Sequence, residues 1–318
     1  MKGATALLRT RGLNPLLTTA GLQLFLEWRG QLVCINYIFL ASLQQLRWRQ
    51  LVGCLQTSTY VPRILTEYSK LARSLLSPVD VHAEQMATLT ALLANLRAAI
   101  HSKDMTNNEK ILSAAYGLEA RLEAWAATFP TSSAYRNIRL SENNYTVRTL
   151  WGKIRIYNTY YLVYPGWVSF NCWCYYRVCR IFVNEIILDC LRPMIAEREV
   201  LGDIRNHCRS IRCTMNQLAA DICASAPHAF GILGESESEE EGGTCLGGYM
   251  LLLPLFVAGS VEGPTHPLRQ YALECFQLIA YGMRIGHALA DIDILRVRAG
   301  VVEWVDELLQ TYGGKPLG

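Results

Sequence analysis

The stretch LGDIRNHCRSIRCTMNQLAADICASA, residues 201–226, decides the fold. Its apolar residues recur at intervals of three and four, the period of one face of an α-helix. They are Ile204, Cys208, Ile211, Met215, Leu218 and Ile222. Three arginines and Asn216 fall on the opposite face, and Pro227 is expected to end the segment. The pattern therefore predicts a long amphipathic helix.

The same helical period runs through most of the chain. Another long helix is predicted over 167–191, directly before the segment just described. The remaining predicted helices cover 22–36, 64–75, 86–100, a segment through 111–125 that starts at Asn107 or Asn108 and stops before Pro130, a short one at Leu251, one that opens at Pro267, and 292–309. Pro254 is expected to kink the helix that contains it.

The aromatic segment 145–164 is ambiguous. Its Val, Ile, Tyr and Trp residues are typical of strands. Helix is nevertheless predicted there, because no alternating pair of hairpin strands is visible and long helical segments flank it. Residues 131–144 are polar and are interpreted as a connection. The expected fold is all-α, a single domain over residues 1–318 made of roughly ten helices without significant sheet.

Composition limits the classes of protein to consider. Hydrophobic residues make up 51% of the chain and charged residues 18%, which indicates a globular protein. The longest apolar run, 249–259, is shorter than the roughly 18 residues of a membrane span and contains Pro254, so a buried helix and no membrane contact are expected. The net charge of +3 does not favour nucleic-acid binding, and Arg205, Arg209 and Arg212 are interpreted as a face for ion pairs between helices.

One acidic insert, GESESEEEGG, begins at Gly234. Like charges repel and glycines loosen the backbone, so a mobile surface loop is predicted at about 234–247. Ser236 and Ser238 each precede a glutamate and are candidate phosphorylation sites. A tolerated insertion between two helices is the simpler interpretation.

Motifs that would support catalysis or metal binding are not found. The sequence has no HExxH, GxSxG, GxGxxG, Walker A or CxxC motif. Asp291 and Asp293 are two positions apart, point to different faces of a helix and are interpreted as solvated surface. Cys172, Cys174 and Cys179 are interpreted as core thiols, and His207 beside Cys208 as a surface pair. No catalytic, cofactor-binding or metal residue is therefore assigned, and the chain is not predicted to be an enzyme.

The eleven irregularly spaced cysteines favour a reducing compartment.

Four segments resemble the fungal-specific regulatory domain of zinc-cluster transcription factors, and together they span nearly the whole chain. They are GATALLRTRG (3–12) with GLQLF (21–25) and Arg29; WCYYRVCRIFVNEIIL (173–188); AADICASAP (219–227); and LLPLFVAGS (252–260) with Leu268, Arg269 and MRIGHAL (283–289). Within the second segment, Arg177, Arg180 and Glu185 are expected to make charged contacts along one helix.

The resemblance implies a nuclear transcriptional regulator that acts through protein partners, self-association or a small-molecule effector. Members of that family carry an N-terminal cluster of six cysteines that binds two zinc ions and reads DNA. This sequence departs from that pattern, so direct DNA binding by this chain is not expected. The departure indicates either a truncated gene product or a reading frame that was started late. Without the resemblance, the cytoplasm is the expected location.

Two other functions remain open. A helical enzyme would bring two or more perturbed carboxylates or histidines together in a cleft. A small-molecule receptor would enclose an apolar cavity. The aromatic residues that would line such a cavity, if they are not ordinary core, are Trp151, Tyr157, Tyr160, Tyr161, Trp167 and Trp173.

Overall fold

The computed structural model describes residues 48, 50–63, 65, 78–140, 145–195, 201–233, 245–303 and 305. The chain divides into two units, Met1–Gly53 and Cys54–Gly318. The described residues of the first unit are helical, and everything below concerns the second. The predicted helix over 22–36, nearly all of that over 64–75, and residues 234–244 of the acidic insert lie outside the described residues, while Leu246 and Gly247 belong to a helix.

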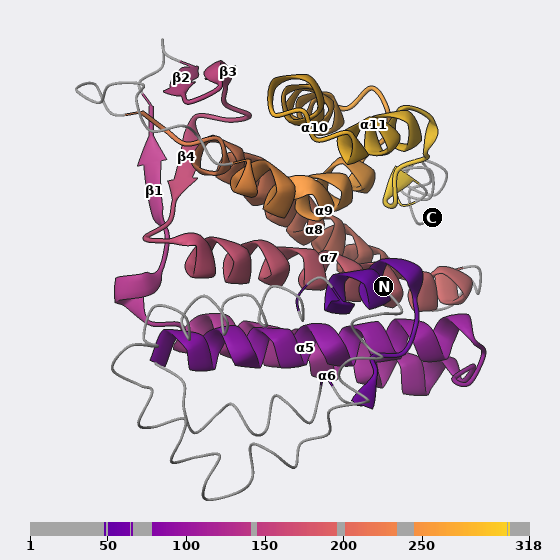
Figure 1. Ribbon diagram of the computed structural model, residues 1–318. Helices are drawn as coiled ribbons and strands as arrows, with labels where there is room; N and C mark the ends of the chain where they lie inside the picture. Colours follow the sequence, from indigo (N-terminus) through magenta and orange to yellow (C-terminus); the bar gives the residue numbers. More distant parts are fainter. Residues whose placement is uncertain are drawn as a thin grey trace, which may run out of the picture. The chain divides into compact units, whose positions relative to one another are not determined.

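Seven α-helices form the body of the second unit. They are α5 (Pro78–His101), α6 (Asn108–Thr128), α7 (Trp167–Ile195), α8 (Leu201–Ala229), α9 (Leu246–Val261), α10 (Pro267–Gln277) and α11 (His287–Val297). Helix α7 packs against α5 and α6 on one side and against α8 and α9 on the other. Helix α9 in turn contacts α10 and α11 (Figure 1). The two long helices that the sequence predicts over 167–191 and 201–226 therefore lie at the centre of the unit.

Two predicted helix starts are confirmed in atomic detail. Asn107 caps α6, where its side-chain oxygen accepts a hydrogen bond from the backbone N–H of Lys110 at 2.9 Å. Pro267 occupies the first turn of α10, where a missing N–H costs nothing, and the ring of His266 accepts from the backbone N–H of Leu268.

Two predicted helix ends are wrong. Helix α8 continues through Pro227 to Ala229, and α11 ends at Val297 instead of near 309. Beyond α11 the backbone turns back to the end of α9, where the N–H of Val301 donates to the carbonyl of Ser260. The N–H of Val302 likewise donates to the carbonyl of Val261. These two hydrogen bonds to α9 take the place of hydrogen bonds within a longer α11. The helix α9 itself runs through Pro254.

The prediction of no significant sheet, and of helix over 145–164, is also wrong. Strand β1 (Arg136–Arg139) pairs antiparallel with β4 (Tyr160–Val163), and β2 (Thr146–Thr149) pairs antiparallel with β3 (Gly152–Arg155). The described part of the whole chain remains mostly helical. It contains eight helices, where roughly ten are predicted for the full sequence.

A two-residue turn explains the hairpin of β2 and β3. The Thr149 hydroxyl donates to the carbonyl of Gly152 at 2.8 Å and accepts from the N–H of Trp151. Gly152 has a φ of +103°, which favours glycine. Thr149 also forms a bridge with Ile232, so the hairpin is attached to the segment that follows α8. Each strand has only four residues, too few for a clear alternation of apolar and polar side chains.

The core of the unit follows the predicted helix faces. Ile211, Met215 and Ile222 of α8 are each at most 5% exposed. Among the residues that the structure describes, no helix combines the length and the apolar character that a membrane span requires.

Candidate functional site

A deeply buried charge of the second unit lies between α7 and α8. Arg177 on α7 is 1% exposed, and its Nε lies 3.8 Å from Oδ2 of Asp221 on α8. Its Nη1 donates to the hydroxyl of Tyr164 at 2.7 Å. The Tyr164 hydroxyl lies 2.7 Å from Ser225 Oγ, and Ser225 donates to the Asp221 carbonyl. One directed chain therefore runs from Arg177 through two hydroxyls, each accepting one bond and donating one.

Asp221 has further donors on its other oxygen. Tyr160 Oη donates to Asp221 Oδ1 at 2.6 Å, and Gln217 Nε2 donates to the same oxygen at 2.9 Å. Burial raises the pKa of both Tyr160 and Tyr164 above the usual tyrosine value, so both hydroxyls keep the protons that they donate.

Aromatic rings enclose the same guanidinium. Its central carbon lies 4.9 Å from the ring centre of Tyr135 and 5.8 Å from that of Trp173. Arg177 Nη2 has no hydrogen-bond partner within the described residues. Cation–π interactions with these rings stabilise the guanidinium instead. The cluster joins β4, α7 and α8, and its chemistry is that of a buried structural ion pair.

The neighbouring charges of α7 also pair between helices. Arg180 donates from Nε to Glu119 of α6 at 2.8 Å, and Arg97 of α5 lies 3.3 Å from Glu185. The expectation of contacts along one helix is wrong, because Arg177 and Arg180 have the same charge and Glu185 is five residues beyond Arg180, outside the i+3 and i+4 spacing.

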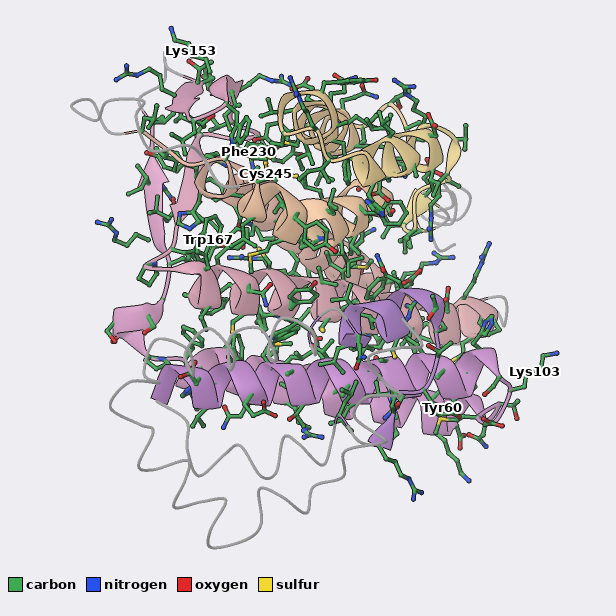
Figure 2. The ribbon with its side chains drawn as sticks, viewed as in Figure 1. Tyr60, Lys103, Lys153, Trp167, Phe230 and Cys245 are labelled. Atoms are coloured by element: carbon green, nitrogen blue, oxygen red, sulfur yellow. The ribbon has the colours of Figure 1, made fainter. Side chains whose placement is uncertain are left out.

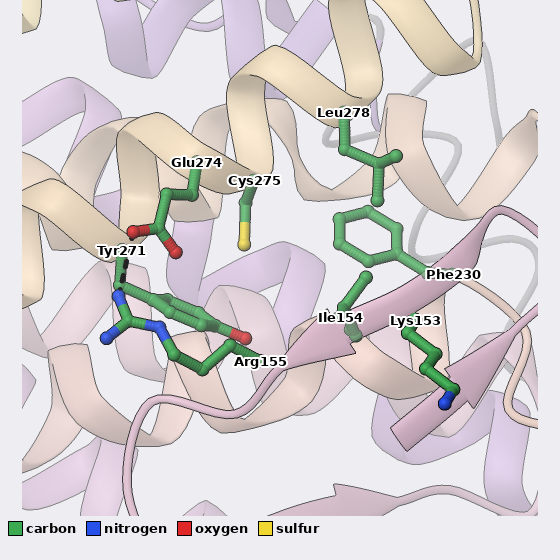
Figure 3. Close-up of a pocket in the computed structure, with 8 residues that line it drawn as sticks. All are labelled: Lys153, Ile154, Arg155, Phe230, Tyr271, Glu274, Cys275 and Leu278. Carbon is green, nitrogen blue, oxygen red and sulfur yellow. Dashed lines mark hydrogen bonds and ion pairs between the residues drawn. The ribbon is translucent and has the colours of Figure 1, made fainter. Parts of the chain in front are cut away.

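A second candidate site is a partly open pocket of about 210 Å³ between β3, the end of α8 and α10. Figure 3 shows that β3 contributes its floor and α10 its opposite wall. The lining residues are Lys153, Ile154, Arg155, Phe230, Tyr271, Glu274, Cys275 and Leu278.

Two buried polar side chains of α10 face this pocket. Tyr271 is 2% exposed and Cys275 is 5% exposed. The Tyr271 hydroxyl makes no hydrogen bond within the described residues, and the Cys275 thiol lies beside it. Burial raises the Tyr271 pKa well above the usual value and that of Cys275 to about 12. Both groups are therefore neutral at physiological pH.

The rim of the pocket carries opposite charges. Arg155 Nη2 lies 2.8 Å from Glu274 Oε1, and the two side chains are 56% and 51% exposed. Lys153 extends outward from β3 (Figure 2), and its ammonium group lies away from Tyr271 and Cys275 (Figure 3). The site thus combines an apolar wall, two neutral polar groups, and a rim that carries one ion pair and Lys153.

The candidate residues from the sequence lie in several places. Cys172, Cys174 and Cys179 are buried core thiols, as predicted. The described residues contain no group of three or more His, Cys, Asp and Glu that could hold a metal ion. Cys208 is buried, so the expected surface pair with His207 is wrong, and His207 instead bonds the Tyr116 hydroxyl at 2.6 Å.

Asp291 differs from the prediction of solvated surface. It is half-buried, and burial raises its pKa to about 6. Asp293 is exposed and lies 3.8 Å from Arg296. The ion-pair interpretation of the basic face is supported at Arg212, which lies 3.0 Å from Glu262.

The six aromatic residues proposed for a cavity do not line the pocket. Tyr157 lies beside a lining residue, with its ring centre 5.6 Å from that of Tyr271. Trp173 packs in the core against Trp125 and Tyr135, and Trp167 packs against Phe170. The sequence does not reveal the pocket, because its lining comes from three separate segments whose contacts are not local in sequence.

Comparison with protein-family models, with curated proteins and with solved structures gives no match to this chain.

Proposed function

We propose that this chain is the helical regulatory region of a transcriptional regulator of the fungal zinc-cluster type, acting in the nucleus through protein contacts or an effector. The support is the ordered set of segments that resemble that family. One observation carries the proposal furthest. Arg177 in WCYYRVCRIFVNEIIL and Asp221 in AADICASAP, two of those segments, form one buried ion pair. Residues that carry the resemblance are therefore residues that hold the helices together.

The proposal assigns no enzymatic reaction to the chain. Two of the acids that lie between helices are engaged by arginines: Glu119 by Arg180, and Glu262 by Arg212. The same pairs occupy arginines that could otherwise bind phosphate groups. Protein contacts are therefore the proposed means of action, and direct DNA binding by these residues is not proposed.

A tethering experiment tests this function. The full chain is fused to an unrelated DNA-binding domain with a nuclear localisation signal, and transcription of a reporter gene bearing the matching sites is measured. We expect transcription to rise or fall at least about threefold relative to the DNA-binding domain alone. The Asp221→Asn variant, which leaves Arg177 without its counter-charge, is expected to lose the effect.

Two controls make the result decisive. Asp293→Asn changes an exposed carboxylate and is expected to keep the full effect on transcription. Immunoblotting and microscopy check that each fusion is present in the nucleus at equal level. A wild-type fusion that is folded, nuclear and without any effect on the reporter contradicts the proposal.

A further inference from the structure

We propose that the pocket between β3, α8 and α10 binds a small neutral molecule with an apolar body and one hydrogen-bond acceptor, such as a carbonyl oxygen. Two independent observations carry this inference: the pocket itself, and the Tyr271 hydroxyl, which is buried in its wall without a hydrogen-bond partner within the described residues. A buried hydroxyl without a partner costs free energy, and a bound acceptor removes that cost.

The walls set the shape and polarity of the ligand. Ile154 of β3, Phe230 after α8 and Leu278 at the end of α10 form an apolar face (Figure 3). Tyr271 and Cys275 supply the polar side, with one hydroxyl donor and one weak thiol donor. A planar ring with a single carbonyl group satisfies both sides.

The charges at the rim favour a neutral ligand over an anion. Arg155 is already neutralised by Glu274 at 2.8 Å, and a carboxylate in the pocket would lie close to that glutamate. Lys153 extends away from the polar side of the pocket (Figure 3). An anion held at the Tyr271 hydroxyl would therefore lose its hydration close to Glu274 and away from the Lys153 ammonium, which is unfavourable.

Size and reactivity define the ligand further. A buried cavity of about 150 Å³ accommodates benzene in another protein. The volume of about 210 Å³ here accommodates a ring with one short substituent. Binding is non-covalent, because burial raises the pKa of Cys275 to about 12 and a thiol in its protonated form is a poor nucleophile.

The location of the pocket links binding to the arrangement of the fold. The β2–β3 hairpin forms the floor, and the Thr149–Ile232 bridge attaches it to the segment after α8. A ligand that contacts both Ile154 and Tyr271 would stabilise the position of the hairpin relative to α10. The inference deepens the proposed function, and it rests on that function only for the ligand's role as an effector.

Direct binding to the purified full chain tests the inference. Three probes are titrated by ligand-observed NMR: acetophenone, ethylbenzene as the apolar analogue without an acceptor, and benzoate as the anionic analogue. We expect acetophenone to bind with a dissociation constant on the order of 1 mM or below. Ethylbenzene should bind more weakly by roughly 3- to 10-fold, the usual value of one neutral hydrogen bond. Benzoate should bind weakest.

Variants assign the binding to this pocket. Tyr271→Phe should bring acetophenone down to the affinity of ethylbenzene and leave ethylbenzene itself unchanged. Tyr157→Phe is the matched control, since its ring packs against Tyr271 but it does not line the pocket. Leu278→Trp fills the pocket and should abolish binding of both probes.

Several results would overturn the inference. They are no binding of acetophenone to the wild-type chain, benzoate binding tightest, and equal affinity of acetophenone for wild type and Tyr271→Phe. A fourth is a Tyr271→Phe chain that unfolds at lower urea concentration than wild type, which would show that the fold itself bonds the hydroxyl. None of these readouts involves transcription, so a failure here is distinct from a failure of the tethered reporter.

Discussion

Arg177 Nε and Asp221 Oδ2 lie 3.8 Å apart between α7 and α8, with the arginine 1% and the aspartate 21% exposed. The distance is that of an ion pair without a direct hydrogen bond between the two side chains. Hydrogen bonds through the hydroxyls of Tyr164 and Ser225 connect the guanidinium to the backbone carbonyl of Asp221. The pair therefore depends on the correct packing of β4, α7 and α8 together.

Loss of one partner should be costly. Asp221→Asn keeps the shape of the side chain but leaves Arg177 without its counter-charge in the core. We expect the free energy of unfolding to fall by about 3–5 kcal/mol, the usual effect of breaking a buried ion pair. Urea unfolding followed by circular dichroism measures it. The exposed carboxylate Asp293, changed to Asn, should alter stability by less than about 1 kcal/mol. Equal effects of the two changes would contradict the buried-pair assignment.

Two glycines should respond to alanine in opposite directions. Gly231 has a φ of +69°, and an added Cβ would overlap the side chain of Leu150. Gly231→Ala is therefore expected to cost about 2 kcal/mol or more in unfolding free energy. Gly117 lies inside α6 with nothing within 4 Å of an added Cβ, so Gly117→Ala should stabilise by roughly 0.5–1 kcal/mol. Thermal unfolding of both variants gives the comparison, and a stabilising Gly231→Ala would contradict it.

The sequence predicts the helical part of this fold because helical periodicity is local. Residues such as Ile211, Met215 and Ile222 recur within a few turns and mark the buried face of α8 by themselves. The strands around Thr149 and Gly152 were missed because four-residue strands carry little periodicity and their pairing depends on partners in another segment. The end of α11 was missed for the same reason, since the hydrogen bond between Val301 and Ser260 is a tertiary one.

The candidate sites were harder to predict than the fold. Arg177 and Asp221 are 44 positions apart, and nothing in their local sequence pairs them. The sequence does not single out Tyr271, because a tyrosine on a helix gives no sign that its hydroxyl lacks a partner. The neighbouring Cys275 likewise appears in the sequence as one of many scattered thiols. Such features depend on what surrounds a side chain in space.

His228 should make stability depend on pH. Its ring packs against Tyr164, Trp167 and Phe170, and burial lowers its pKa to about 4 from 6.5. The unfolded chain then binds more protons between these two values, so stability is lost as pH falls from about 6.5 towards 4. The loss amounts to at most about 3 kcal/mol.

Replacement by phenylalanine isolates this effect. His228→Phe keeps a ring in place and removes the titrating group, so its stability relative to wild type should grow as pH falls through that window. Asp291, whose pKa burial raises to about 6, acts in the opposite sense in both proteins and cancels in the difference. Urea unfolding at several pH values measures the difference. A difference that does not change between pH 7 and pH 4.5 would show that His228 is not desolvated.

The thiols should differ widely in reactivity, because the thiolate is the reactive form and burial suppresses it. Burial raises the pKa of Cys174, Cys179 and Cys275 to about 12, whereas Cys213 is exposed on α8. Under native conditions iodoacetamide should modify Cys213 at least tenfold faster than any of the three buried thiols, as read by peptide mass spectrometry. In urea all four should react at similar rates, which serves as the control. Fast native modification of Cys275 would mean that its thiol is not desolvated in the way that its raised pKa requires.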